Sequence, residues 1–256
     1  MSGKLKVRPR YYRWHVDPGV EWVETNTNYA HLDWDIPLEQ TAVVVVDVWE
    51  RHYLADTEAR ANTIVKEKIV PLLAACRTAG MPIIHAPAPG MAEHQANWLK
   101  LVSKEETKGG PRAEWPPNEF RSKSGAYSQY ARPEEPREPE LKALRAGRRL
   151  HPLVPVEGDE PVIYNGEELH RYCAKEGILF LFFIGFNTNA CILLRDYGTI
   201  EMSKRGYEVI ILRDCGTGME SFETHDELWQ TRGTILFLEM YGKYSLTSKE
   251  VIEGLK

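Results

Sequence analysis

Residues 42–48 read AVVVVDV, and this stretch decides the fold class. Four consecutive valines show no polar alternation, so a strand here is expected to be buried on both faces, which is typical of the central strands of a parallel sheet. The apolar run ends at Asp47. Because ligands of open parallel sheets bind beyond the carboxyl ends of the strands, this carboxylate lies where chemistry is expected.

Outward from this strand, apolar strands alternate with helical segments. Such alternation is typical of βαβ units, which build a parallel sheet with helices on both faces. We therefore predict an α/β fold with three layers, α-β-α, and a mainly parallel sheet of roughly six strands. Strands are predicted at 81–85, 161–164, 178–184 and 208–212, helices over 58–78, 167–176, 190–205 and 222–240, and a short strand and helix at the end.

The length of 256 residues, with 43% hydrophobic and 27% charged residues, fits one large domain. We assign the domain to 41–256 and interpret the aromatic-rich segment 1–40 as an N-terminal extension packed across it. A long proline-rich interruption at about 91–151 is predicted to be a loop insertion that acts as a lid, since its prolines oppose regular helix and central strand.

Charge and composition exclude several classes of partner. The formal net charge is -5 and the basic residues form no block, so we expect no nucleic-acid partner and no membrane anchor. The longest apolar run, 178–186, is too short to cross a bilayer. Four scattered cysteines indicate free thiols in a reducing compartment. We expect a cytoplasmic protein that binds a small-molecule substrate.

The segment 185–191, GFNTNAC, is the most specific signal of function. It is a tight polar turn between a buried strand and a helix that begins near Cys191. A helix N-terminus favours thiolate, the nucleophilic form of cysteine, and its backbone N–H groups can bind an oxyanion. Cys191 is therefore the candidate nucleophile. The other three cysteines are interpreted as core residues: Cys76, Cys173 and Cys215.

Asp47 is the second signal. Burial at the edge of an apolar sheet raises the pKa of a carboxylate unless a cation or a donor compensates. Such a group can serve as the general base toward a thiol. The alternative is a carboxylate that only caps a loop N–H.

Four ordered motifs resemble those of the isochorismatase-like hydrolases: VVVVDVWE, IIHAP, HPLVPVEGDEPVI and FFIGFNTNACI, whose turn IGFNTNAC is the sharpest part. This superfamily includes nicotinamidases, other amidases and isochorismatases, and the match covers roughly 41–255 without the loop. The resemblance implies that Asp47 and Cys191 are catalytic, that the N–H groups of Ala190 and Cys191 form the oxyanion hole, and that the Phe186–Asn187 peptide is cis.

The sequence departs from this family at its third catalytic residue, a lysine after the short strand at 161–164. Tyr164 or Asn165 stands there instead. An aspartate beside a thiolate is a like-charge pair that needs a cation to keep both ionised. Lys123 in the loop is one candidate for that cation, although it is equally compatible with a solvated loop charge. Alternatively, Asn165 supplies a neutral hydrogen bond.

Three further side chains are candidates for the substrate pocket. Trp49 could stack on a planar substrate, His85 ends the second strand, and His52 follows the first. Asp47, His52 and His85 are suitable metal ligands by type, but their spacing is not diagnostic. We predict no metal and no other cofactor.

Three functions are compatible with these residues. The leading prediction is an amidase-type hydrolase that cleaves a C–N bond of a small amide or carbamoyl compound through a Cys191 thioester. The second is an isochorismatase-type vinyl ether hydrolase that uses Asp47 without covalent catalysis. The third is a catalytically silent member that binds a metabolite or a protein. The family's assembly through helical faces and the Trp- and Tyr-rich flanks predict a homo-oligomer.

Overall fold

The computed structural model describes residues 3–103, 106 and 115–256. The chain divides into two compact units. The larger, here called the body, comprises Met1–Leu101 and Arg148–Lys256, and the smaller, here called the inserted unit, comprises Val102–Gly147.

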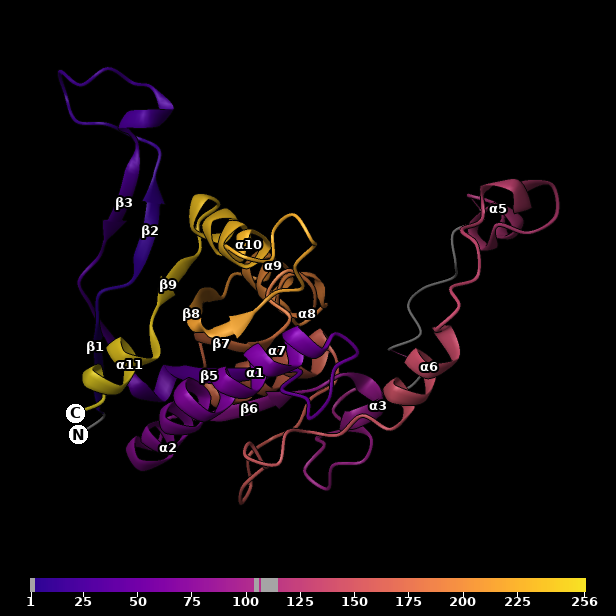
Figure 1. Cartoon of the computed structure of the whole chain (residues 1–256). Coiled ribbons are helices and arrows are strands. Elements are labelled where there is room, and N and C mark those ends of the chain that lie inside the picture. The colour runs from indigo at the N-terminus through magenta and orange to yellow at the C-terminus, as the bar shows by residue number, and fades with distance from the viewer. Residues whose placement is uncertain (1–2, 104–105, 107–114) are drawn as a thin grey trace. The chain divides into compact units, whose positions relative to one another are not determined.

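A seven-stranded sheet forms the centre of the body, in the order β3-β2-β9-β8-β7-β5-β6 (Figure 1). The five strands from β9 to β6 run parallel, whereas β2 and β3 are antiparallel to their neighbours. The prediction of a mainly parallel α/β sheet is confirmed. The strands are β2 (Arg10–Arg13), β3 (Asn28–His31), β5 (Thr41–Val46), β6 (Ile83–Ala86), β7 (Phe180–Phe186), β8 (Glu208–Thr217) and β9 (Tyr244–Leu246).

The valine run forms β5, between β6 and β7. Val44 pairs with Ile84 on one side and with Phe183 on the other. All six residues of β5 are buried. Because side chains alternate across a strand, Val43 and Val45 join one core cluster and Val44 and Val46 join the other. Both faces of the strand are therefore covered, which explains why it carries no polar alternation.

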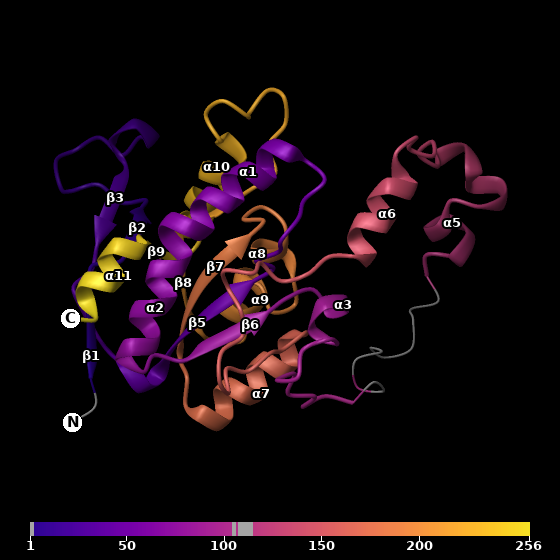
Figure 2. The same ribbon diagram turned by 60° about the horizontal axis from the view of Figure 1, so that its bottom comes forward.

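Helices cover the two faces of the sheet and complete the three layers (Figure 2). One core cluster includes residues of η3, α2 and α11, and the other includes residues of α7, α8, α9 and α10. The helical elements of the body are η1 (Glu24–Asn26), η2 (Leu38–Gln40), α1 (Ala55–Ile64), the π-helical η3 (Val65–Ile69), α2 (Val70–Ala79), α3 (Pro89–Ala92), α7 (Gly166–Glu176), α8 (Cys191–Leu194), α9 (Thr199–Lys204), α10 (Trp229–Met240) and α11 (Ser248–Gly254).

The segment 1–40 contributes strands to the body. β1 (Lys4–Val7) pairs with β4 (Trp34–Pro37) in a separate two-stranded sheet, and β2 and β3 extend the main sheet from β9. These two strands are added to the predicted set, while the strand predicted at 161–164 does not form, so the main sheet has seven strands where the sequence predicts roughly six. Leu5 and Ile36 anchor the small sheet in the core.

The inserted unit contains helices, which corrects the prediction of a structureless loop. They are α5 (Asn118–Ser122), the 3-10 helix η4 (Gly125–Tyr130) and α6 (Glu138–Ala146). Pro139 does not prevent α6 because it lies in the first turn, where backbone N–H groups have no helical partner. Residues 91–101 and 148–151 belong to the body, and 104–105 and 107–114 lie outside the described residues.

Two predicted elements are shorter in the structure. The strand predicted at 161–164 is reduced to isolated bridges at Val162. The helix predicted from 222 begins only at Trp229, where the Glu220 carboxylate accepts hydrogen bonds from the N–H groups of Gln230 and Thr231. This carboxylate satisfies donors at the helix start.

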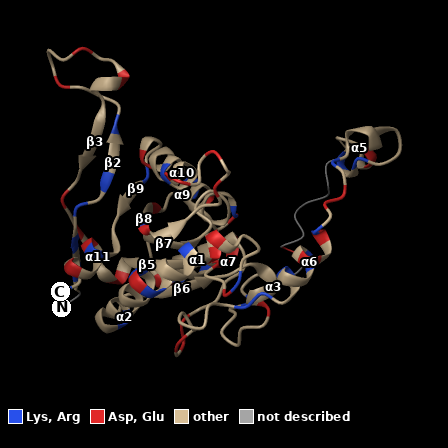
Figure 3. Cartoon of the chain, in the orientation of Figure 1, with Lys and Arg blue, Asp and Glu red and all other residues tan. Residues whose placement is uncertain are grey.

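Lys and Arg residues and Asp and Glu residues are interspersed along the described elements (Figure 3). Among the described residues, no helix is long and apolar enough to span a bilayer.

Candidate active site

Asp47 directly follows β5. Its backbone has φ of 45°, a left-handed conformation that aspartate tolerates better than most residues and that often marks functional sites. The side chain is buried, and its carboxylate accepts a hydrogen bond from the N–H of Ala88, which lies just beyond β6. The carboxylate is therefore fixed at the carboxyl ends of two neighbouring strands.

Cys191 follows β7 across the polar turn. The Phe186–Asn187 peptide in this turn is cis. Gly185 brings β7 close to β5, since a Cβ atom there would lie 1.9 Å from the carbonyl oxygen of Val46. Only glycine permits this approach, and its φ of 114° is also one that other residues rarely adopt. The close approach holds the turn beside Asp47.

The structure brings Asp47 and Cys191 together, and each group changes the pKa of the other. Burial raises the pKa of Asp47, although the bonds from Cys191 and the charge of Arg195 oppose this. Burial and the Asp47 carboxylate raise the pKa of the Cys191 thiol to about 11. The resting thiol is therefore protonated at neutral pH, contrary to the expectation that the helix N-terminus favours thiolate. Its helix, α8, is a single turn.

A cation beside this pair is Arg195. Its guanidinium nitrogen Nη2 is 3.7 Å from Oδ2 of Asp47, and its charge lowers the pKa of Asp47 and of the Cys191 thiol. The charge of Arg148 also lowers the pKa of Asp47. Arg195 is not among the residues predicted from the sequence, because the family resemblance points to the position of the lysine and the local pattern predicts a continuous helix over 190–205.

Arg195 reaches the pair because the helix predicted over 190–205 is broken. α8 ends at Leu194 and α9 begins at Thr199, with Arg195 in an extended conformation between them. Next to it, the Asp196 carboxylate accepts a hydrogen bond of 2.9 Å from the N–H of Gly166 at the start of α7. This contact fixes the break from outside the helix.

The expected oxyanion hole is only half available. The N–H of Ala190 donates to the carbonyl of Asn187 at 3.0 Å, within the turn itself. Ile192 donates to the same carbonyl at 3.2 Å. Among the described residues no acceptor takes the N–H of Cys191, so this donor is available to a bound oxygen atom.

The chain matches the model of the isochorismatase domain over residues 41–235. It belongs to the isochorismatase family. This match covers most of the chain and includes both Asp47 and Cys191, so the resemblance stated from the motifs is confirmed. The family is one of hydrolases, and the search of curated proteins finds no relative that matches this chain.

Solved structures share the fold of this family member at low sequence identity. A cysteine hydrolase from Pseudomonas syringae pv. phaseolicola 1448A is 19% identical, with a TM-score of 0.53 over 87% of this chain and 95% of that one. An isochorismatase family protein from Desulfovibrio vulgaris subsp. vulgaris str. Hildenborough is 14% identical, with a TM-score of 0.52 over 84% and 98%. These likenesses show the fold alone.

Asn165, at the position of the family lysine, is a helix cap in this isochorismatase-family chain. Its side-chain oxygen accepts a hydrogen bond of 2.8 Å from the N–H of Glu168, at the start of α7. Its side-chain nitrogen is buried and has no partner among the described residues. Asn165 therefore stabilises α7, and its side-chain hydrogen bond is made to Glu168 and not to Asp47 or Cys191.

Trp49 and His85 occupy the core. Trp49 is buried and stacks on His52 and against Phe186, with ring centroids 4.8 and 5.0 Å apart. His85 is buried and its Nε2 lies 2.8 Å from Glu160, which also pairs with Arg77. The described contacts of both residues are thus structural and do not support the prediction that they line the substrate pocket.

His85 and Arg77 determine the charge state of Glu160. Although burial raises its pKa, the hydrogen bonds from His85 and Arg77 bring the pKa of this carboxyl down to about 2. The carboxylate is therefore charged at neutral pH.

His52, which is a candidate metal ligand by residue type, also has a hydrogen-bond partner in the chain. His52 accepts the Leu54 N–H at 3.1 Å through Nδ1. In the described part of the chain, no group of three or more His, Cys, Asp or Glu side chains is arranged to hold a metal ion.

Lys123 belongs to the inserted unit. It ends α5 in a left-handed conformation, and its ammonium lies over the Phe120 ring, 3.5 Å from the centroid. This contact holds the Lys123 ammonium against Phe120 within the inserted unit. Within the body, Arg195 supplies a cation beside Asp47, and Arg148 also lowers the pKa of that carboxyl by its charge.

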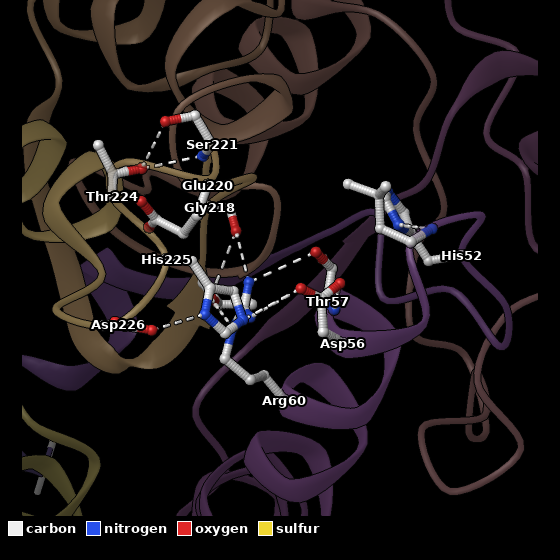
Figure 4. A network of polar contacts seen from close by, with 12 residues as sticks. His52, Asp56, Thr57, Arg60, Gly218, Glu220, Ser221, Thr224, His225 and Asp226 are labelled. Carbon is white, nitrogen blue, oxygen red and sulfur yellow. Dashed lines mark hydrogen bonds and ion pairs between the residues drawn. The ribbon is translucent and has the colours of Figure 1, made fainter.

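A polar network joins α1 to the loop that follows β8 (Figure 4). The Asn189 side chain makes two hydrogen bonds with the backbone of Met219, and Arg60 of α1 contacts Thr217 and Gly218 in the same loop. His225 of this loop lies 3.1 Å from Asp56. The hydrogen bonds of Asn189 hold the Cys191 turn against the loop at the end of β8.

Proposed function

We propose that this chain is a cysteine hydrolase that cleaves a C–N bond of a small amide or carbamoyl compound. The observation that carries the proposal is the placement of Cys191 beside the buried Asp47 carboxylate, where the two groups interact strongly enough to shift each other's pKa. A nucleophile in contact with a base is the arrangement that covalent catalysis requires. Membership of a hydrolase family supports the same reaction class.

The proposed reaction passes through two covalent steps. Asp47 takes the thiol proton as the sulfur attacks the substrate carbonyl, and the Cys191 N–H stabilises the oxyanion that forms. Asp47 then returns the proton to the leaving nitrogen as the C–N bond breaks. Water, deprotonated by Asp47, hydrolyses the thioester, and the proton returns to the sulfur. A carboxyl whose pKa is raised by burial suits this role because it is a stronger base.

Replacement of the nucleophile tests this function. Purified chain is incubated with small primary amides and N-carbamoyl amino acids, and ammonia release is measured. Cys191→Ala is expected to abolish the release, whereas Cys173→Ala, at a buried cysteine of α7, is the matched control that retains it. If Cys191→Ala hydrolyses an accepted amide at the wild-type rate, the thioester mechanism is wrong.

A second candidate function rests on the same acidic residue. The raised pKa of Asp47 also suits an acid that protonates a vinyl ether, as in the isochorismatase branch, and the protonated thiol is then a spectator. Turnover of isochorismate by Cys191→Ala, with loss of that activity in Asp47→Asn, would favour this function.

A silent binding member is the least favoured function. The absence of the family lysine favours it, but Arg195 provides a cation 3.7 Å from Asp47 that also acts on Cys191. A site without chemistry has no need of this arrangement.

A further inference from the structure

We propose that Arg195 is the catalytic cation of this site: it stabilises the Cys191 thiolate beside the Asp47 carboxylate and binds the oxyanion of the intermediate. The inference rests on the proposed function. Nothing in the family resemblance predicts it, because the family cation is a lysine after a different strand, where this chain has Tyr164 and Asn165.

The first argument is geometric. Arg195 directly follows α8, and its N–H bonds to the carbonyl of Cys191 at 3.2 Å, which fixes it one turn away from the nucleophile. Its guanidinium lies 3.7 Å from the Asp47 carboxylate, and its charge also acts on the Cys191 thiol. One side chain therefore interacts with both members of the pair.

The second argument concerns charge. When the proton leaves the thiol, two negative groups would lie together unless the carboxylate takes that proton. The guanidinium attracts whichever of the two groups is ionised. It therefore stabilises the site both when the proton is on the thiol and when the proton is on the carboxyl group. Arg195 indeed lowers the pKa of the thiol and of the Asp47 carboxyl, against the larger effect of burial.

The third argument is the incomplete oxyanion hole. The Ala190 N–H is taken by Asn187, which leaves the N–H of Cys191 as a backbone donor. The Arg195 side chain is 38% exposed, and a guanidinium has five N–H donors. Since Arg195 lies beside Asp47 and interacts with Cys191, its remaining donors are proposed to reach the carbonyl oxygen of a group bonded to that sulfur. Arg195 supplies the second donor.

The choice of arginine also restricts the proton transfers. A guanidinium stays charged throughout the working pH range and neither gives nor takes a proton in the cycle. The proton that leaves the thiol must therefore move to Asp47 and from there to the leaving nitrogen. Arg195 contributes a constant positive charge while the C–S bond forms and the C–N bond breaks.

Alkylation of Cys191 tests the inference without knowledge of the substrate. Rates of reaction with neutral iodoacetamide and anionic iodoacetate are measured by peptide mass spectrometry over pH 6–10. In wild type, the cation favours the anionic reagent. Arg195→Met is expected to lower the rate of alkylation by iodoacetamide about tenfold, which corresponds to about one unit of thiol pKa. The rate with iodoacetate is expected to fall by a larger factor. Arg195→Lys should restore most of both rates, and Arg195→Gln is a second neutral variant.

Arg232→Met is the matched control. Arg232 is an exposed arginine of α10 with one long contact to Glu227, and its removal should leave both rates unchanged. A structural role for Arg195 would change the two reagents equally. The inference is overturned if the neutral variants retain the wild-type pH profile and the wild-type ratio of the two reagents.

Hydrolysis separates this inference from the proposed function. With an accepted amide, Arg195→Met is expected to lower kcat at least tenfold with a smaller change in KM, because the cation acts on the intermediate. Activity that survives Cys191→Ala refutes the thioester function. Activity that requires Cys191 but is unchanged in Arg195→Met refutes only the role of Arg195.

Discussion

At the scale of single residues, Asp47 combines burial, a left-handed backbone and a carboxylate within reach of a thiol. None of these favours stability. A buried carboxylate is costly unless it is paired, and strained backbone persists where the surrounding structure enforces it. The residue thus has the features of one retained for chemistry.

The pH dependence of activity follows from this environment. Asp47 must be ionised to accept the thiol proton, and burial raises its pKa above 3.8. The acidic limb of kcat/KM is therefore expected above pH 3.8. The alkaline limb is expected near pH 11, where the thiol of the free enzyme loses its proton. An acidic limb at or below pH 3.8 would contradict the role of Asp47 as base.

Asp47→Asn is expected to stabilise the chain while it abolishes activity. The raised pKa means that the folded chain binds this proton more tightly than the unfolded chain, so the wild type loses stability as pH rises from 3.8 through the folded value. Asparagine keeps the side-chain oxygen for the Ala88 N–H and has no such loss. In urea unfolding, Asp47→Asn is expected to raise the free energy of unfolding by on the order of 1 kcal/mol at pH 7 and by less at pH 4. A lower free energy of unfolding than that of the wild type at pH 7 would contradict this account.

At the scale of elements, the break between α8 and α9 determines where Arg195 lies. The local sequence favours a continuous helix over 190–205, whereas the contact that fixes the break comes from Gly166, on α7. A Cβ atom at Gly166 would lie 2.0 Å from the carbonyl oxygen of Asp196. The break is therefore a tertiary feature.

Gly166→Ala should displace the segment that carries Arg195. The clash is with backbone and cannot be relieved by a rotamer, so we expect a loss of about 1–3 kcal/mol of unfolding free energy and at least a tenfold loss of activity. Gly233→Ala in α10 is the control, since its Cβ would meet no atom within 4 Å. That change should stabilise by about 0.5–1 kcal/mol. Equal effects of the two substitutions would show that the close approach is not a constraint.

At the scale of the whole molecule, the N-terminal strands join the body through a buried ion pair. Arg10 of β2 bonds to Glu239 of α10 at 2.8 Å, and the Glu239 side chain is fully buried. Ser245 of β9 donates to the same carboxylate. The segment 1–40 is thus tied to the opposite end of the chain.

Arg10→Met is expected to destabilise the chain by about 3 kcal/mol, because it leaves the Glu239 carboxylate buried without its cation. Arg8→Met is the matched control in the preceding connection, since both Arg8 and Asp33 are exposed in their ion pair. It should change the unfolding free energy by less than about 0.5 kcal/mol. Similar melting curves for the two variants would contradict the importance of the buried pair.

The sequence was informative where local pattern decides structure. The valine run and the glycine-containing turn sufficed to predict β5, β7 and the contact-forming residues Asp47 and Cys191. Long-range contacts decide the rest. Arg195 reaches its site through Gly166, and β2 and β3 extend the sheet through pairing with β9, more than 200 residues away. The roles of His85 and Asn165 depend on partners that spacing does not reveal.

The central claim is that Cys191 forms a covalent acyl intermediate with Asp47 as its base. The most direct measurement is peptide mass spectrometry of wild-type chain, quenched in acid during turnover of an accepted amide. The account predicts an acyl adduct on the peptide that contains Cys191, absent from Cys191→Ala and greatly reduced in Asp47→Asn. Turnover without any adduct on Cys191, at a rate that Cys191→Ala equals, would contradict it.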